Sequence, residues 1–199
     1  MKRLVLASGN RKKVAELESL IAPFGWQVLP QTQLNVPEAV EDGLSFVENA
    51  LIKARHAAKI TGLPALADDS GLAVDALNGA PGIYSARFAG EPSNDANNNA
   101  LLLEKMIEVP EGARTAAFHC VLALVRTWDD PVPVICHGVW QGEILQTAKG
   151  ENGFGYDPLF WVPELGKASA ELTPEEKNRL SHRGRAMAML AAQWQQLGL

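Results

Sequence analysis

The amino-acid sequence predicts an α/β protein, because short apolar runs typical of buried strands alternate with segments in which apolar residues recur at helical spacing. Strands are expected at residues 3–8, 26–29, 116–125 and 132–140, and shorter apolar runs occupy 63–67 and 72–74. Helices are expected at about 12–22, 45–61 and 95–106, and in two pieces after residue 173. The chain has 199 residues, 47% of them hydrophobic and 21% charged, which suits one domain with a real core.

Composition excludes several classes of function. The formal net charge of −5 argues against broad nucleic-acid binding. No apolar run approaches the roughly 18 consecutive residues of a membrane span, and the apolar part of residues 1–8 is too short for a signal peptide. We therefore expect a cytoplasmic protein that binds neither nucleic acid nor membrane, and that holds any anionic ligand with a local basic cluster.

The first strand leads through a short polar loop into a helix, which is the usual place for a bound phosphate. The candidate phosphate ligands are Ser8, Gly9, Asn10, Arg11, Lys12 and Lys13. Three cations at a helix start oppose the helix dipole, and a bound anion would reverse that effect. The pattern is not a Walker loop. The alternative to a phosphate site is a solvated basic turn. We expect the helix to end at Pro23 and Gly25.

A capping box at residues 45–48, Ser-Phe-Val-Glu, predicts the start of the second helix. Asn49, Lys53 and His56 share one of its faces by their spacing, so Lys53 is either a ligand-binding residue or simply solvated. An acidic connector that contains Glu38 and Glu41 precedes this helix.

The stretch Ala65–Val74 organises the chain. It joins two apolar runs through Asp68, Asp69, Ser70 and Gly71. We expect a tight reversal at Ser70 and Gly71, which would place both carboxylates at the mouth of a strand. Adjacent buried carboxylates need compensating cations, and magnesium favours such ligands together with substrate phosphates. The alternative is a solvated turn.

Each of the two cysteines stands beside a histidine, a pattern that invites a zinc interpretation. The pairs are His119-Cys120 and Cys136-His137. A hairpin centred on residue 128 would place Cys120 opposite Cys136 and His119 opposite His137. Because neighbours on a strand point to opposite faces, the four side chains could not converge on one tetrahedral ion. We expect buried free thiols that react slowly.

A glycine-aromatic loop spans residues 150–158, where glycines allow a ligand close to the backbone and aromatic rings offer a stacking surface. The alternative is a tight turn with its aromatics folded inward. A second capping box, Thr173–Glu176, opens the next helix. In a continuous helix His182 would lie about 140° from Lys177, so we expect a break near Leu180. A final helix capped by Ser181 would then bury a stripe formed by Met187, Leu190, Ala191, Trp194 and Leu197.

Together these motifs resemble the inosine/xanthosine triphosphate pyrophosphatase family, nearly end to end. The resemblance rests on six segments in the family's order: Ser8-Gly9-Asn10-x-x-Lys13, Phe46-x-Glu48-Asn49-Ala50, Ala67–Leu72, Pro81–Arg87, Gly153–Pro158 and Ser181–Gly184. It implies an elongated, two-lobed α/β fold around a central mixed sheet flanked by helices. It also implies one nucleotide pyrophosphatase domain over residues 1–199, an active site in the cleft between lobes, and a homodimer.

The implied reaction is hydrolysis of ITP, dITP, XTP or dXTP to the nucleoside monophosphate and pyrophosphate with Mg²⁺. By position, residues 8–13 and Lys53 would hold the triphosphate. Asp69 would be the general base and a metal ligand, with Asp68 also a metal ligand and Ser70 a substrate contact. The nucleoside would be held by Phe154, Gly155, Tyr156, Asp157, Lys177, His182 and Arg183. The family carries a metal-binding glutamate in the connector. Because position 40 is Val40, Glu41 takes that role, and Glu38 is the alternative.

Three other functions compete with this one. A pyrophosphatase for modified pyrimidine nucleotides is disfavoured only through the resemblance of the residues assigned to the base. A nucleotide sensor that does not hydrolyse its ligand would have no use for two adjacent aspartates beside a phosphate loop. A structural interaction protein would leave the cationic helix start and the glycine-aromatic loop unexplained.

Overall fold

A computed structural model describes residues 2–9 and 11–194 of the chain. It divides into two compact units. Unit 1 contains the described residues up to Asp69, the segment Cys120–Gly138, and the chain from Ala186 onward. Unit 2 contains Ser70–His119 and Val139–Arg185.

The strands form a mixed sheet in the order β2-β1-β3-β4-β5-β6-β7. Their bounds are β1 Lys2–Leu6, β2 Trp26–Pro30, β3 Ala65–Val74, β4 Thr115–Val125, β5 Val134–Ile144, β6 Phe160–Val162 and β7 Lys167–Ala168. Strand β1 pairs in parallel with β2 and β3, whereas β6 pairs antiparallel with β5 and β7. The predicted α/β class and mixed sheet are confirmed.

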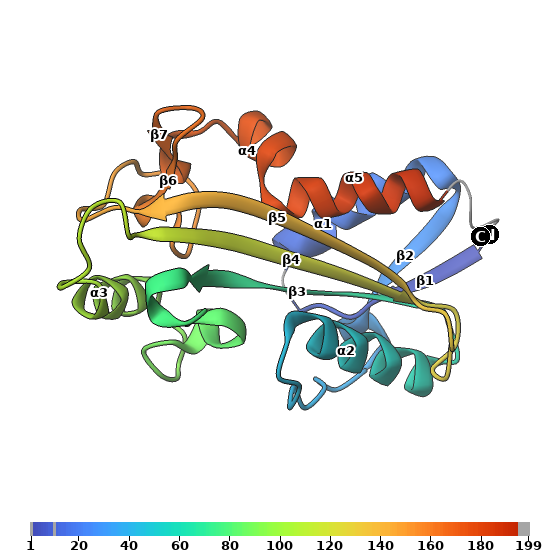
Figure 1. The fold of residues 1–199 in the computed structure, drawn as a ribbon. Coiled ribbons are helices and arrows are strands. Elements are labelled where there is room, and N and C mark those ends of the chain that lie inside the picture. The colour runs from blue at the N-terminus through green and yellow to red at the C-terminus, as the bar shows by residue number, and fades with distance from the viewer. Residues whose placement is uncertain (1, 10, 195–199) are drawn as a thin grey trace. The chain divides into compact units, whose positions relative to one another are not determined.

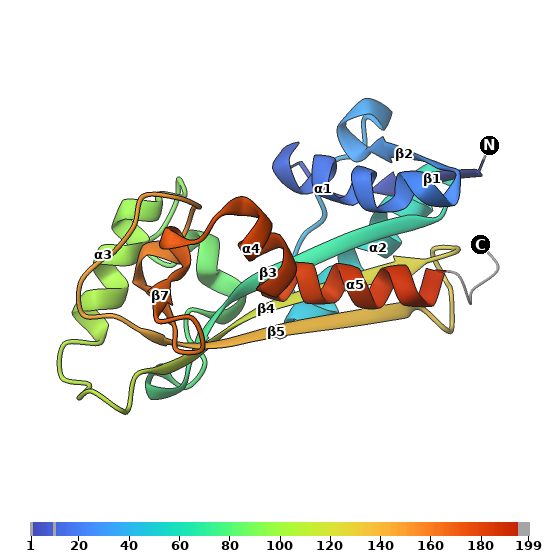
Figure 2. The ribbon, with the colours of Figure 1, turned by 90° about the horizontal axis from the view of Figure 1, so that it is seen from above.

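Unit 1 has a helical layer on each face of its sheet. Helix α1 (Arg11–Ile21) and the part of α5 (His182–Trp194) that belongs to this unit cover one face, and α2 (Phe46–Thr61) covers the other (Figures 1 and 2). Alternation along the strands sorts the core accordingly: Leu4, Leu6 and Leu66 pack with α1 and α5. Val5, Ala65 and Ala67 pack with the alanines of α2.

The predicted helix ends of unit 1 are present. Ser45 caps α2 by accepting a hydrogen bond from the Glu48 N–H, and the Glu48 carboxylate accepts one from the Ser45 hydroxyl. Pro23 lies in the short 3₁₀ helix Ala22–Phe24, which follows α1 and ends at Gly25 with a φ of 76°. This left-handed conformation is one that glycine adopts without strain.

Unit 2 packs around an aromatic cluster of Phe118, Trp140 and Phe160, which buried residues of helix α3 (Asp95–Lys105) join. The second capping box opens α4 (Pro174–Leu180) as predicted. The expected helix break is also confirmed, because Ser181 is extended and its hydroxyl accepts the Gly184 N–H at 3.2 Å. Helix α5 then starts at His182.

The predicted reversal at Ser70 and Gly71 is wrong. Strand β3 runs without interruption from Ala65 to Val74, so both aspartates lie inside it. The polar residues suggested a turn. The strand can bury them because Lys13 of α1 pairs with Asp68 on one face and Lys53 of α2 pairs with Asp69 on the other. Of the last helix's predicted stripe, Leu190 and Trp194 are buried and Met187 is partly buried, while Leu197 lies outside the described residues.

Both cysteines are free and buried, as expected. Burial raises the pKa of the Cys136 thiol to about 11. Within the described chain, no helix is both long and apolar enough to cross a membrane.

Candidate functional site

The side chains of the two adjacent aspartates of β3 lie on opposite faces of the sheet in unit 1. Neighbouring strand residues alternate, so each meets the helix that covers its own face. The Asp68 carboxylate pairs with Lys13 Nζ of α1 at 2.6 Å, and the Asp69 carboxylate pairs with Lys53 Nζ of α2 at 2.9 Å. We call these four residues and Glu41 the unit 1 cluster.

The register of the parallel strands places the predicted phosphate loop beside this cluster. Leu6 of β1 is opposite Leu66 of β3, and the Ala7 N–H donates to the Leu66 carbonyl at 2.8 Å. Strand β1 therefore ends opposite Leu66, two residues before Asp68 on β3, and α1 starts at Arg11. Anions bind readily at such helix starts beside the carboxyl ends of parallel strands. Asn10 and the side chains of Arg11 and Lys12 lie outside the described residues.

The predicted face of α2 holds the acidic connector in place. The Asn49 side-chain oxygen accepts the Gly43 N–H at 2.9 Å, and the His56 Nε2 lies 2.9 Å from the Pro37 carbonyl oxygen. Between them, Lys53 Nζ lies 3.1 Å from the Glu41 carboxylate while also contacting Asp69. The structure thus brings Glu41 and Asp69 to one lysine.

Glu38, the alternative candidate for the metal-binding glutamate, lies near Gly9 of the predicted phosphate loop. A Cβ built on Gly9 would be 3.6 Å from the Glu38 Oε1. Its carboxylate is therefore next to the phosphate loop. The side chain of Val40, which lies between Glu38 and Glu41 in the connector, is 79% exposed.

Burial leaves the Asp69 carboxylate under-compensated. Desolvation raises its pKa, and the opposing charge of Lys53 does not fully cancel this effect. Burial lowers the pKa of Lys53, but Asp69, Asp68 and Glu41 outweigh it, so the net shift is upward and the ammonium stays charged. Among the described residues, no hydrogen-bond donor reaches the buried Oδ2 of Asp69. A buried carboxylate oxygen of this kind needs a cation or a donor.

No group of three or more His, Cys, Asp or Glu side chains among residues 2–9 and 11–194 is gathered around a common point for a metal. Side chains alternate along β3, so Asp68 points to the other face, and Lys53 lies between the carboxylates of Asp69 and Glu41. Asp69 and Glu41 nevertheless fit a hard cation, since both carboxylates already share one positive charge and Asp69 Oδ2 has unused capacity.

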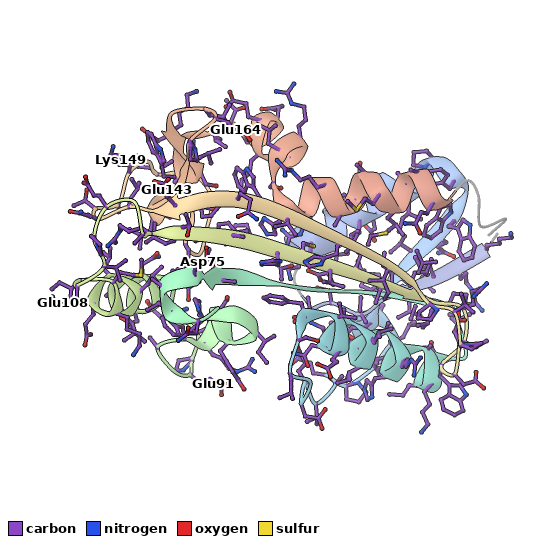
Figure 3. All side chains as sticks on the ribbon, in the orientation of Figure 1. Asp75, Glu91, Glu108, Glu143, Lys149 and Glu164 are labelled. Atoms are coloured by element: carbon purple, nitrogen blue, oxygen red, sulfur yellow. The ribbon has the colours of Figure 1, made fainter. Side chains whose placement is uncertain are left out.

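Unit 2 contains a second lysine–aspartate cluster, at the glycine-aromatic loop. Asp157 is 2% exposed, whereas Glu91, Glu108 and Glu164 of the same unit lie at its periphery (Figure 3). The Asp157 carboxylate accepts hydrogen bonds from the Phe154 N–H at 2.8 Å, the Ser169 hydroxyl at 2.9 Å and the Lys177 ammonium. Asp157 therefore holds the loop together, because its oxygens are occupied within the protein.

The two aromatic residues of the loop behave differently. Phe154 is 47% exposed, and Lys177 Nζ lies 4.6 Å from the centre of its ring. Tyr156 is buried in the core, and its hydroxyl donates to the Ser85 carbonyl at 2.7 Å. Of the two predicted stacking rings, only that of Phe154 lies at the surface of unit 2.

His182 and Arg183 are buried at the start of α5, contrary to the usual surface position of such residues. The His182 ring stacks on Phe118, with centroids 4.8 Å apart and planes 14° apart. The next residue, Gly184, has no room for a side chain, because a Cβ there would lie 1.8 Å from the Asn178 carbonyl oxygen. Only glycine allows the two helices to meet this closely.

Sequence reasoning missed four residues that contact the glycine-aromatic loop. They are Ser85, Asp95, Asn99 and Ser169. The i, i+4 spacing of Asp95 and Asn99 on a predicted helix was a usable signal. Nothing in the sequence connects Ser85 or Ser169 with the loop, because those contacts depend on tertiary structure.

The fold and the unit 1 cluster define an α/β protein with paired acidic and basic groups on β3, next to the loop that follows the carboxyl end of β1, a position that suits phosphates and their counter-ions. Comparison with known proteins makes this specific. The Ham1 family profile matches residues 4–193, and the chain belongs to the Ham1 family.

Relatives agree with this assignment along almost the whole chain. A dITP/XTP pyrophosphatase of Vibrio cholerae serotype O1 is 60% identical over 190 residues, which cover 96% of this chain and 95% of that protein. A HAM1 protein from Coxiella burnetii has a solved structure with a TM-score of 0.95 and 51% identity, covering 98% of this chain and all of that one. A dITP/XTP pyrophosphatase from Mycobacterium abscessus gives a TM-score of 0.81 at 47% identity, covering 94% and 97% of the two chains.

Proposed function

We propose that this protein hydrolyses the non-standard purine nucleoside triphosphates ITP, dITP, XTP and dXTP to the monophosphate and pyrophosphate. Its role would be to remove deaminated purines from the nucleotide pool. The observation that carries the proposal is the Asp69 carboxylate, which is buried, paired with Lys53 and left with one unpartnered oxygen, next to Asp68, which pairs with Lys13 near the start of α1. The dITP/XTP pyrophosphatases among its relatives support the choice of substrate.

The triphosphate is assigned to unit 1. Ser8, Gly9 and the start of α1 offer backbone and side-chain donors, and Lys13 and Lys53 neutralise phosphate charge. Asp69 orients or deprotonates the attacking water with the carboxylate that faces α2. Asp68 keeps Lys13 in position on the other face, which is a supporting role.

Magnesium is the metal that this donor set suits best, with Glu41 and Asp69 as its protein ligands. Such an ion, when bound, neutralises the phosphate oxygens in the hydrolysis of an anhydride. The lysine that now joins the two carboxylates would then be released to contact phosphate.

The nucleoside is assigned to unit 2. Phe154 offers a stacking surface, and Lys177, His182 and Arg183 are the side-chain donors. Backbone N–H groups of the loop are less available for hydrogen bonds to the base than the glycines of the sequence suggested. Those of Phe154, Gly155 and Asp157 already donate to Asp157, to Asp95 and to the Phe154 carbonyl, respectively. Lys177 also donates to Asp157, and we assign recognition of the 6-oxygen of hypoxanthine or xanthine to His182 and Arg183. We assign Ser70, which follows Asp69 on β3, to a substrate contact as well.

A substrate panel tests the proposal. Pyrophosphate release with Mg²⁺ is measured for ITP, XTP, ATP, GTP and a modified pyrimidine triphosphate. We expect kcat/KM for ITP and XTP to exceed that for ATP and GTP by at least ~10², because adenine presents an amino group to donors meant for an oxygen. Arg183→Ala should narrow this gap by lowering the ITP value. Preference for the pyrimidine would transfer the assignment to the competing pyrophosphatase, and binding without turnover would indicate a nucleotide sensor.

We also propose that the active form is a homodimer working in the cytoplasm, as the family resemblance implies. Light scattering of the purified protein at micromolar concentration tests the dimer. A monomeric mass with full activity would contradict it.

A further inference from the structure

Residues 150–156 of the glycine-aromatic loop in unit 2 belong to no helix or strand, and a short 3₁₀ helix begins at Asp157. Gly153 and Gly155 have φ values of 81° and 60°, a left-handed conformation on each side of Phe154. The direction of the Phe154 ring therefore depends on how the flanking peptides are fixed.

Helix α3 holds both backbone groups of Gly155. The Asp95 Oδ2 accepts the Gly155 N–H at 2.7 Å, and the Asn99 Nδ2 donates to the Gly155 carbonyl at 2.8 Å. The two side chains are four residues apart, and so lie on the same face of the first turns of the helix.

The orientation of the Asn99 amide is determined by its partners. Its Nδ2 also donates to the Asp95 carbonyl at 2.8 Å, so both contacts are to acceptors and only the amino group can satisfy them. Asn99 thereby links the helix backbone to the loop, and we call Asp95 and Asn99 the α3 clamp.

The clamp complements contacts that hold the neighbouring residues. The Phe154 N–H donates to the Asp157 carboxylate, and the Tyr156 hydroxyl donates to the Ser85 carbonyl. Gly155 has no side chain, so its position depends on its peptide groups. Without the clamp, the peptide between the exposed ring and the buried tyrosine could rotate.

We propose that Asp95 and Asn99 are positioning residues that set base selectivity by fixing the Gly155 peptide, and with it Phe154. The inference rests on the proposed function, because it assumes that Phe154 stacks on a purine. Loss of the clamp would loosen the fit to every base and weaken the alignment of the 6-oxygen with its donors. Misplacement by about 1 Å is enough to cost up to ~10²-fold in a positioned reaction.

The test compares Asn99→Ala and Asp95→Ala with Asn97→Ala, an exposed asparagine on the same turn of α3. We expect Asn99→Ala to raise the KM for ITP by about 10-fold with kcat within twofold, and to narrow the ITP-to-ATP ratio of kcat/KM. Asp95→Asn should restore most of what Asp95→Ala loses, since an amide oxygen still accepts the Gly155 N–H. Asn97→Ala should leave all values unchanged.

Hydrogen exchange provides a second measurement that does not depend on turnover. Exchange of the amides at 153–157 should accelerate in Asn99→Ala but not in Asn97→Ala. An unchanged KM and an unchanged selectivity ratio would overturn the proposal, as would a fall in kcat that is equal for ITP and ATP. If the unmodified protein does not distinguish ITP from ATP, the proposed function's account of base recognition fails. Unchanged exchange at the loop in Asn99→Ala overturns the clamp itself.

Discussion

Each unit buries an aspartate against a lysine, but the two aspartates are in different states. Asp157 in unit 2 accepts three hydrogen bonds, one from Phe154 of its own loop and two from Ser169 and Lys177. Asp69 in unit 1 has one oxygen paired with Lys53 and a second, buried oxygen without a donor among the described residues. A satisfied polar network makes a structure rigid, whereas an unsatisfied one costs stability. The difference separates a residue that builds a site from one that acts in it.

The largest expected effect comes from removing the charge at Asp69. Asp69→Asn should lower kcat by ~10²–10⁴ with little change in ITP binding, because the amide cannot accept a proton from water. Steady-state pyrophosphate release and calorimetric binding of a non-hydrolysable analogue measure the two quantities. The control is Asp75→Asn, an exposed aspartate just after β3. Near-normal turnover in a folded Asp69→Asn protein would remove Asp69 from the mechanism.

The same substitution at Asp157 should act on binding and folding. We expect Asp157→Asn to raise the KM for ITP by about 10-fold to 10²-fold with a small change in kcat, and to lower the free energy of unfolding by about 1–3 kcal/mol. The reason is that Asp157 accepts three donors, and a neutral amide fits them poorly. Asp69→Asn should leave the free energy of unfolding equal or higher, because its raised pKa means that the folded state disfavours the charged form. Equal destabilisation by both variants would contradict the contrast between the clusters. Denaturant unfolding at pH 7 measures it.

Lys13 tests the phosphate side of unit 1. Lys13→Ala should weaken ITP binding by about 10-fold and IMP binding less, since its charge lies at the helix start where the outer phosphates are assigned. Titration calorimetry of both ligands gives the comparison, with Lys59→Ala in the last turn of α2 as a charge-matched control. Equal weakening of both ligands would place Lys13 away from the β and γ phosphates.

Local signals in the sequence were sufficient for most of the fold. The capping boxes at Ser45 and Thr173 and the break at Ser181 were all readable, because each is satisfied by residues three or four positions away. The turn predicted at Gly71 failed for the opposite reason. Whether Asp-Asp-Ser-Gly bends or stays extended depends on Lys13 and Lys53, which lie far away in the sequence.

The site was only partly predictable for the same physical reason. Residue type and spacing indicated which charged groups belong to the candidate site, but not how they pair. Because side chains alternate along β3, Asp68 faces α1 and Asp69 faces α2. The predicted turn at Ser70 and Gly71 did not imply this arrangement. Asp157 was predicted to bind substrate, while its contacts in unit 2 give it a role in holding the loop. The spacing of Asp95 and Asn99 indicates that they share a helix face, but their contacts with Gly155 depend on the path of the loop.

The smallest predicted effect is a shift in the titration of Asp69, and it tests the metal assignment directly. In metal-free protein, the carboxyl carbon of Asp69 should titrate above the ordinary aspartate value of about 3.9, because desolvation outweighs the pull of Lys53. Lys53→Met should raise this pKa further. The sign for stability follows: the charged carboxylate costs stability above its folded pKa, and this cost declines as the pH falls below that value and is gone below the ordinary aspartate pKa.

Added Mg²⁺ should lower the pKa, since a cation at Asp69 favours the ionised form. Carbon-detected NMR of labelled protein follows the titration, and the signal absent from Asp69→Asn identifies the residue. Glu41→Gln should reduce the magnesium-induced shift, whereas Glu38→Gln should not if Glu41 is the second ligand. A metal-free pKa below the ordinary value would contradict the contrast between the two clusters. A pKa that Mg²⁺ leaves unchanged would move the metal away from Asp69, and the unpartnered oxygen would then need another donor, such as the attacking water.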